Sequence, residues 1–416
     1  MRTIILFVAT IIFQHTVFAQ ERCGSAAYQK KVQLNYTGTK SLQIPDGTKI
    51  TIQQNTEQPI SAPVPTERIV IPVVVHILYR TDNENISNDQ ILSQLEALNA
   101  DFNQANADFK NAPAVFASKA GNANIRFELA TVDPEGRSTT GIIRKKTGVQ
   151  FWTDNDKIKY NGHTGSSAWD TKQYLNIWVG GLVNGLLGYA TFPGGDAEKD
   201  GIVLRTDVFG TRGKLTAPFN KGRTLTHEVG HWLNLKHIWG DYSCGDDGVD
   251  DTPRQRSSNN GCPSFPRVNA GCDNGTTGDM FMNFMDFTDD ACMNMFTSGQ
   301  VMLMRKEFAA TGNRNSFLAT KGLHTPWNLS VVAAEVSAGT TSIQVYPNPA
   351  SNTIQVKSVA EFPLTGKSFS IFSPAGQIFV TGKINQQNQM ISIQSIPAGM
   401  YFIRIEDQVQ KFIKSR

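Results

Sequence analysis

The sequence has almost no net charge and few histidines and cysteines, and these shortages restrict what the protein can be. Its 39 basic and 36 acidic residues leave a formal charge of +3, and the lysines and arginines are dispersed, which argues against nucleic acid or an anionic membrane as partner. After the first twenty residues no apolar run is long enough to span a bilayer. With 40% hydrophobic and 18% charged residues, the 416-residue chain is expected to form two or more domains with proper cores.

The first twenty residues differ from the rest of the chain because they contain a long apolar run. Arg2 gives a positive start, Ile4–Phe13 is almost wholly apolar, and Val17 and Ala19 stand where a signal peptidase reads small residues. The pattern predicts a secretory signal peptide over residues 1–19. A membrane anchor is the alternative, but it needs about 20 apolar residues and this run is about half as long.

The polar stretch that follows, residues 20–67, is expected to be a propeptide. It ends in a proline-rich segment, Pro59–Arg68, that is typical of an exposed, extended linker. The β-branched run Ile69–Tyr79 then predicts a buried strand. Ser87 can cap a following amphipathic helix, Ser87–Gln104, with Gln90 completing a capping box.

Residues 68–325 are predicted to form one α+β layered domain, because further strands alternate with these helical patterns. A tight turn near residues 184–185 is expected between the second and third of these strands. The predicted strands are Ile125–Val132, Tyr174–Val183, Leu186–Phe192 and Gly201–Phe209.

The C-terminal part has a different pattern. Residues 326–342 are small and polar and predict a linker. Residues 343–416 consist of short alternating runs separated by turn signals, which indicates a small all-β sandwich of about seven strands.

Four of the five cysteines cluster in the second half of the α+β domain. Two disulfides and one leftover thiol, Cys23, are the natural expectation in an exported chain. Four cysteines allow three pairings, and the spacing does not choose among them. The four are Cys244, Cys262, Cys272 and Cys292.

Three of the seven histidines fall within eleven residues, in the stretch THEVGHWLNLKH. His227 and His231 are four residues apart and would share one helix face, so both can bind one metal ion, with Glu228 beside it as a general base. A catalytic zinc takes three protein ligands, and His237 can be the third only if the helix ends before it. Asn234 is suited to the left-handed conformation that ends a helix. The alternative is an amphipathic helix with ordinary histidines.

The histidine stretch HEVGHWLNLKH, with NFMDFTDDAC at residues 283–292, resembles the pappalysin family of metzincin metalloproteases. The resemblance runs from about residue 69 to about residue 317 and implies a metzincin-type zincin domain. It also implies that Met285 forms an apolar floor beneath the zinc. Two positions depart from the family pattern: Asn234 replaces a glycine, and Phe287 replaces a tyrosine that can donate a hydrogen bond. We therefore expect a working but slower protease.

The resemblance implies a zinc endopeptidase in which Glu228 takes a proton from water and passes it to the leaving amine. It implies cleavage before Arg or Lys, with Asp290 at the base of the pocket for that residue. From the residues alone, Asp289 and Asp290 could instead form a solvated turn. The resemblance also assigns the predicted strand Leu186–Phe192 to the rim on which substrate pairs, although such a strand could simply belong to the core.

The acidic stretch GDDGVDDTP, residues 245–253, crowds like charges that a calcium ion would relieve, although a solvated acidic loop is the alternative. The resemblance favours calcium, and it pairs Cys244 with Cys272 and Cys262 with Cys292. The candidate calcium ligands are Asp247, the Val249 carbonyl, Asp250 and Thr252.

Cys23 lies in the predicted propeptide and has two interpretations. Relatives with a cysteine switch imply that it binds the zinc of a latent form, so that the chain's own propeptide is its inhibitor. The alternative is an incidental free thiol. The Glu67–Arg68 bond is a candidate processing site, because an enzyme that prefers Arg after the cut could sever it.

The C-terminal module resembles a type IX secretion sorting domain through its PNP and PAG turns and basic end. This implies the secretion machinery as a partner and a secreted or surface-attached product. By physical pattern alone such a sandwich could instead bind carbohydrate or protein. The rival to the protease is a non-enzymatic adhesin with a structural zinc domain, but structural zinc is normally closed by four protein ligands, and only three are evident here.

Overall fold

The computed structural model describes residues 22–38, 63–137, 139–183, 185–269, 271–323, 343–358, 363–372, 378–397, 399–405 and 408–415. The predicted signal peptide and the predicted linker at 326–342 lie outside these residues. The chain divides into two compact units, Met1–Leu323 and His324–Arg416. Within the described stretches, no helix has the length and apolar character needed to cross a membrane.

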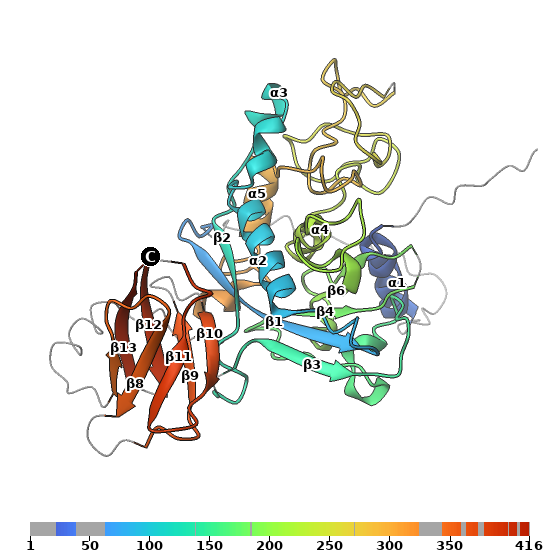
Figure 1. Cartoon of the computed structure of the whole chain (residues 1–416). Helices are drawn as coiled ribbons and strands as arrows, with labels where there is room; N and C mark the ends of the chain where they lie inside the picture. The colour runs from blue at the N-terminus through green and yellow to red at the C-terminus, as the bar shows by residue number, and fades with distance from the viewer. Residues whose placement is uncertain are drawn as a thin grey trace, which may run out of the picture. The chain divides into compact units, whose positions relative to one another are not determined.

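The first unit is built on a mostly parallel sheet of strand order β2-β1-β4-β6-β5, with β3 also paired to β1 (Figure 1). Only β5 is antiparallel to its neighbour, β6, and it forms one edge of the sheet. The strands are β1 (Ile69–Tyr79), β2 (Ile125–Leu129), β3 (Ile142–Lys146), β4 (Leu175–Gly180), β5 (Gly188–Ala190) and β6 (Ile202–Arg205).

The central strand, β1, has the bounds that the β-branched run predicts. It is paired with β2 and β3 along one edge and with β4 along the other, and side chains on both of its faces pack into hydrophobic clusters. Leu186 N donates to Val183 O at 3.2 Å, at the place of the expected tight turn, but the strands on either side of it, β4 and β5, do not pair with each other. Strand β6 lies between them, so the chain leaves β4, passes to the edge and returns through the middle.

Two helices cover one face of this sheet. Helix α2 (Asn88–Phe102) begins after Ser87, whose Oγ accepts from Gln90 N at 3.1 Å. The Gln90 side chain donates to Phe209 O at 2.8 Å, so only half of the expected capping box forms. Helix α4 (Arg223–Trp232) packs beside α2 and against β5 and β6 (Figure 1). The other α-helices are α1 (Ser25–Gly38), α3 (Ala114–Ala117) and α5 (Ser298–Lys306).

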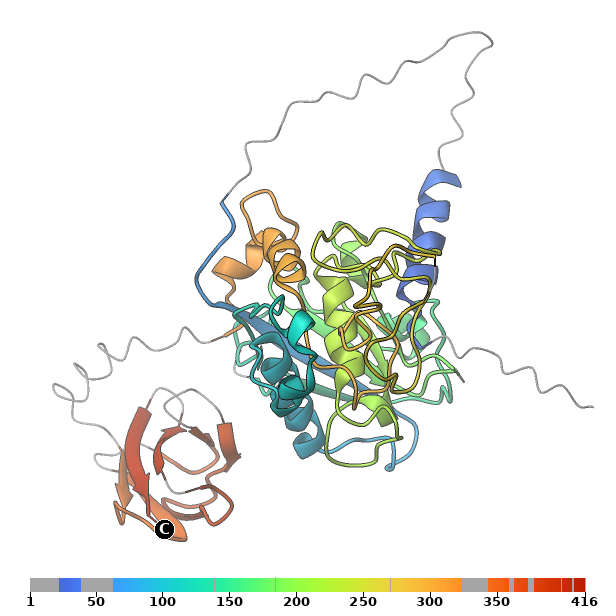
Figure 2. The same cartoon turned by 90° about the horizontal axis from the view of Figure 1, so that it is seen from above.

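Helix α1 precedes the sheet in sequence and lies at its β5 edge. Seen from above, α4 lies between α1 and α2 (Figure 2). The segment before α1 therefore reaches the face of α4 that α2 leaves free, which becomes important for the site.

Between α4 and α5 the described residues form no helix or strand, yet the segment is ordered by covalent and polar contacts. Disulfides join Cys244 to Cys272 and Cys262 to Cys292. The buried Asp286 carboxylate accepts from Asn259 N at 2.7 Å and from Gln255 Nε2 at 3.0 Å. The disulfides are the pairing that the family resemblance implies, and they hold residues 241–278, which contribute little to the apolar core.

The second unit contains the seven-stranded all-β fold that the alternating runs predict. Its antiparallel strands form a four-stranded sheet, β10-β9-β12-β13, and a three-stranded sheet, β11-β8-β7. Inward-facing aliphatic and aromatic side chains build its own core. The strands are β7 (Ile343–Tyr346), β8 (Thr353–Ser358), β9 (Ser368–Phe372), β10 (Ile378–Lys383), β11 (Asn388–Ser392), β12 (Gly399–Ile405) and β13 (Gln408–Lys414).

Candidate metal centre

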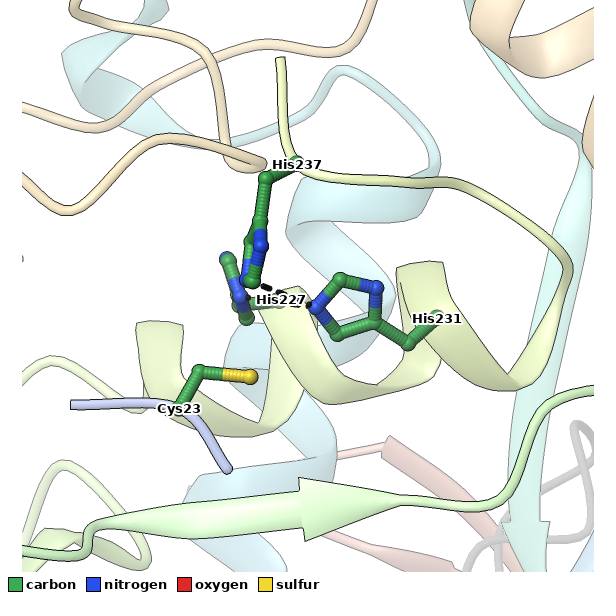
Figure 3. A group of neighbouring side chains, drawn as sticks. All are labelled: Cys23, His227, His231 and His237. Atoms are coloured by element: carbon green, nitrogen blue, oxygen red, sulfur yellow. Dashed lines mark hydrogen bonds between the residues drawn. The ribbon is translucent and has the colours of Figure 1, made fainter. Parts of the chain in front are cut away.

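Helix α4 and the loop after it bring three imidazoles together. His227 and His231 lie one turn apart on α4, and His237 comes from the loop (Figure 3). The Nε2 atom of His231 lies 3.1 Å from the Nε2 atoms of both other histidines. In the part of the chain that the structure describes, these histidines and Cys23 are the only group of three or more His, Cys, Asp or Glu side chains that could hold a metal.

The end of α4 makes this convergence possible. The helix stops at Trp232, and Asn234 adopts a φ of 77°, the left-handed conformation expected of it. Leu235 N donates to Gly230 O at 2.9 Å, and the Asn234 side chain donates to Glu307 Oε1 at 2.7 Å. This turn reverses the chain and returns His237 to the helix face.

The hydrogen bonds of the rings assign their protons. His227 Nδ1 lies 2.7 Å from Phe284 O and His231 Nδ1 lies 2.7 Å from Leu235 O, so each Nδ1 must donate. His237 Nδ1 contacts the Asp241 carboxylate in the same way. All three Nε2 atoms therefore direct lone pairs at one point, which is unfavourable unless a cation lies there. The donor set fits zinc, for which neutral imidazole is a preferred ligand.

Burial reinforces the neutral form of these rings. It lowers the pKa of His231 to about 3, and it lowers the pKa of His227 well below its ordinary value, with the neighbouring histidines adding to the effect. Because a metal competes with protons for the ring nitrogens, histidines that stay neutral are already prepared for binding.

Cys23 supplies a fourth group from far away in the sequence. Its Sγ atom and the histidine nitrogens all lie within 4.8 Å of one another, and the thiol is directed at the imidazoles (Figure 3). The backbone around it pairs with the edge strand: Gly24 N donates to Gly188 O at 2.9 Å, and Leu187 N donates to Arg22 O at 3.1 Å. Residues 22–24 thus lie along the start of strand β5.

Glu228 points into the same cleft and is completely buried. Its Oε2 atom accepts from Ser25 Oγ at 2.7 Å, and Ser25 Oγ in turn accepts from Ala190 N at 2.8 Å. Its Oε1 atom has no hydrogen-bond partner among the described residues. Burial raises the pKa of this carboxyl to about 7, which gives the group a proton affinity suited to acid–base work near neutrality.

Apolar side chains enclose the histidines. Met285 is buried against α4 so closely that a Cβ at Gly230 would lie 2.4 Å from its Sδ atom. The Trp239 ring stacks on His237 with centroids 4.4 Å apart, and the Phe287 ring lies 4.9 Å from the same imidazole. Phe287 thus occupies the wall of the centre with a ring that can donate no hydrogen bond.

A pocket beside the metal centre contains Asp290, which is completely buried, so the solvated turn considered for it is wrong. Its Oδ2 atom accepts from Lys221 N at 2.8 Å, whereas Oδ1 has no hydrogen-bond partner among the described residues. The Arg22 side chain enters this pocket. It donates to Thr288 O at 2.5 Å, and its guanidinium carbon lies 4.1 Å from the Phe219 ring centroid.

The acidic loop is only partly gathered. Thr252 Oγ1 lies 2.9 Å from Asp247 Oδ1 and 2.8 Å from Val249 O, so three of the four candidate calcium ligands lie together. Asp250 is exposed. Burial raises the pKa of Asp247 to about 6, and this carboxylate has no ion-pair partner within 4.0 Å in the described chain.

Sequence reasoning missed several residues at this site. Trp239 follows His237 by two positions and could have been suspected as a ring beside the metal. Arg22 directly precedes Cys23 and Ser25 follows it by two residues, so their side chains could have been considered as further contacts of the predicted propeptide. Tyr28 carried no recognisable signal, since its partners are more than a hundred residues away.

Comparisons with known proteins agree with this geometry. The sequence pattern of the family described as pregnancy-associated plasma protein-A, peptidase family M43, matches residues 159–309. That of a secretion system C-terminal sorting domain matches residues 344–415. An extracellular metalloprotease of Arthroderma benhamiae is 32% identical over 253 residues, which cover 59% of this chain and 79% of the relative.

Solved structures extend the likeness. Mature mirolysin of Tannerella forsythia, in complex with a cleaved peptide, is 50% identical and superposes with a TM-score of 0.60, covering 61% of this chain and 96% of mirolysin. A promirolysin mutant of the same organism is 42% identical with a TM-score of 0.62, and the match covers 71% of this chain and 96% of that one.

Fold and site together define a zincin-type metalloprotease. The chain belongs to the pregnancy-associated plasma protein-A family, the pappalysins, and it is a mirolysin-like member that carries a secretion sorting domain at its C-terminus. It is an extracellular enzyme, exported through the secretion system that this domain serves. The rival interpretation, a non-enzymatic adhesin, does not agree with this membership.

Proposed function

We propose that the protein is a zinc endopeptidase made as a latent precursor, which cleaves peptide bonds before Arg or Lys with Glu228 as general base. The observation that carries the proposal is the convergence of three Nε2 lone pairs beside a buried carboxylate that has one unpartnered oxygen. His227, His231 and His237 would hold the ion.

When bound, zinc would polarise the scissile carbonyl and make a water molecule more acidic. Glu228 takes the proton of the attacking water, because its carboxylate faces the cleft from the helix that carries two of the ligands. The same carboxyl then returns that proton to the leaving amine. The aromatic enclosure, with Trp239 and Phe287, excludes bulk water from this exchange.

Two contacts of the prosegment support latency. The Cys23 thiol lies where a fourth zinc ligand would lie, so it would exclude water from the metal. Ser25 donates to Glu228, so the same segment also occupies the proposed general base. Cys23 lies just before α1 and Ser25 is its first residue, so both contacts are lost when the prosegment leaves.

Arg22 supports the specificity for basic residues. A guanidinium already fills the pocket beside the metal centre, where the charge of Asp290 opposes the lowering of the Arg22 pKa by burial. The unpartnered Oδ1 of Asp290 offers a further acceptor to a basic side chain of a substrate. Asp290 is therefore our proposed determinant of cleavage before Arg or Lys.

We further propose a calcium ion at Asp247, Val249 O and Thr252, since a buried carboxylate without a basic partner favours a cation. Processing is proposed at Glu67–Arg68. Glu67 and Arg68 are exposed, and the Arg305 guanidinium, which donates to Glu67 O at 2.7 Å and also contacts Pro65 O, holds the backbone beside this bond.

The test compares precursor and processed forms of the full chain. Processed enzyme should cleave peptides with Arg after the scissile bond, lose this activity to a zinc chelator and regain it with zinc. Glu228→Gln should keep one zinc per chain and lose cleavage, whereas the exposed Glu96→Gln, as control, should retain it. Unprocessed Cys23→Ala should cleave peptide that the unprocessed wild type does not. A fully active Glu228→Gln, or a fully latent Cys23→Ala, contradicts the proposal.

A further inference from the structure

One side chain anchors helix α1 to the rest of the first unit. Tyr28 stands in the first turn of α1 and is only 2% exposed. Its hydroxyl donates to Asp156 Oδ2 at 2.7 Å, and its ring lies 5.1 Å from the ring of Tyr189 on the rim strand β5. A side chain of the prosegment thus fills a pocket that belongs to the catalytic unit.

The walls of this Tyr28 pocket are held by contacts that do not involve the prosegment. Lys159 is completely buried, and its Nζ atom lies 3.0 Å from Asp156 Oδ1 and 2.7 Å from Lys199 O. Trp178 Nε1 donates to Ser166 O at 2.7 Å. None of these bonds involves Tyr28, so we expect the pocket to persist in the processed enzyme as a preformed site.

The chemistry of the pocket selects a phenol. The Lys159 ammonium lies 5.3 Å from the Tyr28 ring centroid and 5.1 Å from that of Tyr189, so it favours an electron-rich ring between them. Asp156 accepts the hydroxyl at the far end of that ring. Phenylalanine would fill the same space and leave this carboxylate oxygen without its donor, which costs binding free energy.

The pocket adjoins strand β5 on the face of the sheet opposite α4, because Tyr189 packs there with Trp178 and Val203 while Gly188 and Ala190 face the helix. The prosegment passes from Arg22 in the pocket of Asp290, through Cys23 at the metal centre, to Tyr28. Cys23 pairs with Gly188 at the metal, and Ser25 contacts Ala190 two residues along the same strand. Tyr189, between them, forms a wall of the Tyr28 pocket. If Asp290 binds the residue after the scissile bond, this pocket meets residues before it.

We propose that the Tyr28 pocket is a substrate subsite of the processed protease, which binds a tyrosine side chain on the amino-terminal side of the scissile bond. This inference rests on the proposed function. The prosegment holds the subsite in the precursor, and a substrate tyrosine takes the same place afterwards.

The experiment uses processed, zinc-loaded enzyme and peptides with a fixed Arg after the scissile bond. Tyr, Phe or Ala is placed at each of several positions before that bond, and kcat/KM is measured. At one position, Tyr is expected to exceed Phe by about tenfold and Ala by more. In Asp156→Asn the Tyr-to-Phe ratio should fall toward one, whereas the control Asp154→Asn should keep the wild-type ratio.

Equal kcat/KM for Tyr and Phe at every position, or an unchanged Tyr-to-Phe ratio in Asp156→Asn, would refute the proposed subsite. Neither result would contradict the proposed protease function. No cleavage of any peptide by the wild type would instead overturn the proposed function. If Asp156→Asn does not fold, wild-type enzyme answers the same question. N-acetyl-tyrosinamide must then inhibit it at lower concentration than N-acetyl-phenylalaninamide, and equal inhibition refutes the subsite.

Discussion

Asp290 offers a direct test of specificity, because the structure separates its structural bonds from its free charge. Oδ2 accepts from Lys221 N at 2.8 Å and from Arg223 N at 3.3 Å, and these bonds hold the pocket loop to the start of α4. Oδ1 has no hydrogen-bond partner among the described residues. Asp290→Asn keeps one acceptor oxygen for the backbone and replaces the other oxygen with an uncharged donor, so the loop should persist while the pocket loses its charge.

The size of the effect follows from the lost interaction. A hydrogen bond to a charged group contributes about 1.5–3 kcal/mol. At ~1.4 kcal/mol per factor of ten, removing the charge should lower kcat/KM for a substrate with Arg after the scissile bond by roughly 10- to 150-fold. The loss should be far smaller for a substrate in which citrulline, the uncharged isostere, replaces that Arg.

The assay measures kcat/KM of processed enzyme on two quenched fluorescent peptides that differ only in Arg or citrulline after the scissile bond. The ratio of the two values should be large for the wild type and close to one for Asp290→Asn. Asp289→Asn is the matched control, since its carboxylate also acts electrostatically on Arg22 but does not line the pocket, and it should keep most of the wild-type ratio. A wild-type ratio in Asp290→Asn would refute the reasoning.

Three further predictions concern stability. Gly230→Ala should lower the free energy of unfolding by about 1–2 kcal/mol in urea, because its Cβ would lie 2.4 Å from Met285 Sδ; Gly148→Ala, with nothing within 4 Å, should not. Burial lowers the pKa of His76 to about 4. As pH falls below 6.5, this imidazole therefore binds a proton in the unfolded chain but not in the folded one. About 3 kcal/mol of stability should then be present above pH 6.5 and lost toward pH 4, and His76→Gln should flatten that dependence. Calcium at about a hundredfold above Kd should raise Tm by roughly 5–10 °C in wild type and not in Asp247→Asn.

Much of the fold could be predicted because the deciding interactions are local. The β-branched run of β1 and the serine before α2 each determine their element within a few residues. The order of the strands could not be predicted in this way. Strand β5 lies at the sheet edge because β6 returns between it and β4, and this depends on packing against α4 rather than on the turn at residues 184–185.

The residues of the site fall into the same two groups: some are determined by local sequence, and others only by contacts between distant parts of the chain. The spacing of the histidines and the conformation of Asn234 are encoded within eleven residues, so the metal centre could be predicted from them. Arg22 and Tyr28 reach partners 266 and 128 residues away. Only the folded chain brings them to Thr288 and Asp156, and no periodicity or local motif marks such pairs.

These distant contacts bear on how a single short segment could keep the proposed precursor latent without being cut itself. At the metal centre the segment presents the Cys23 thiol rather than a peptide carbonyl, so the group that hydrolysis must attack is absent there. Ser25 donates a hydrogen bond to Glu228. Arg22 fills the pocket that contains Asp290, and Tyr28 fills the pocket that contains Asp156. Each contact replaces one that a substrate needs. Latency should therefore depend on the sum of these contacts, so the loss of the thiol alone would weaken the prosegment without releasing it completely.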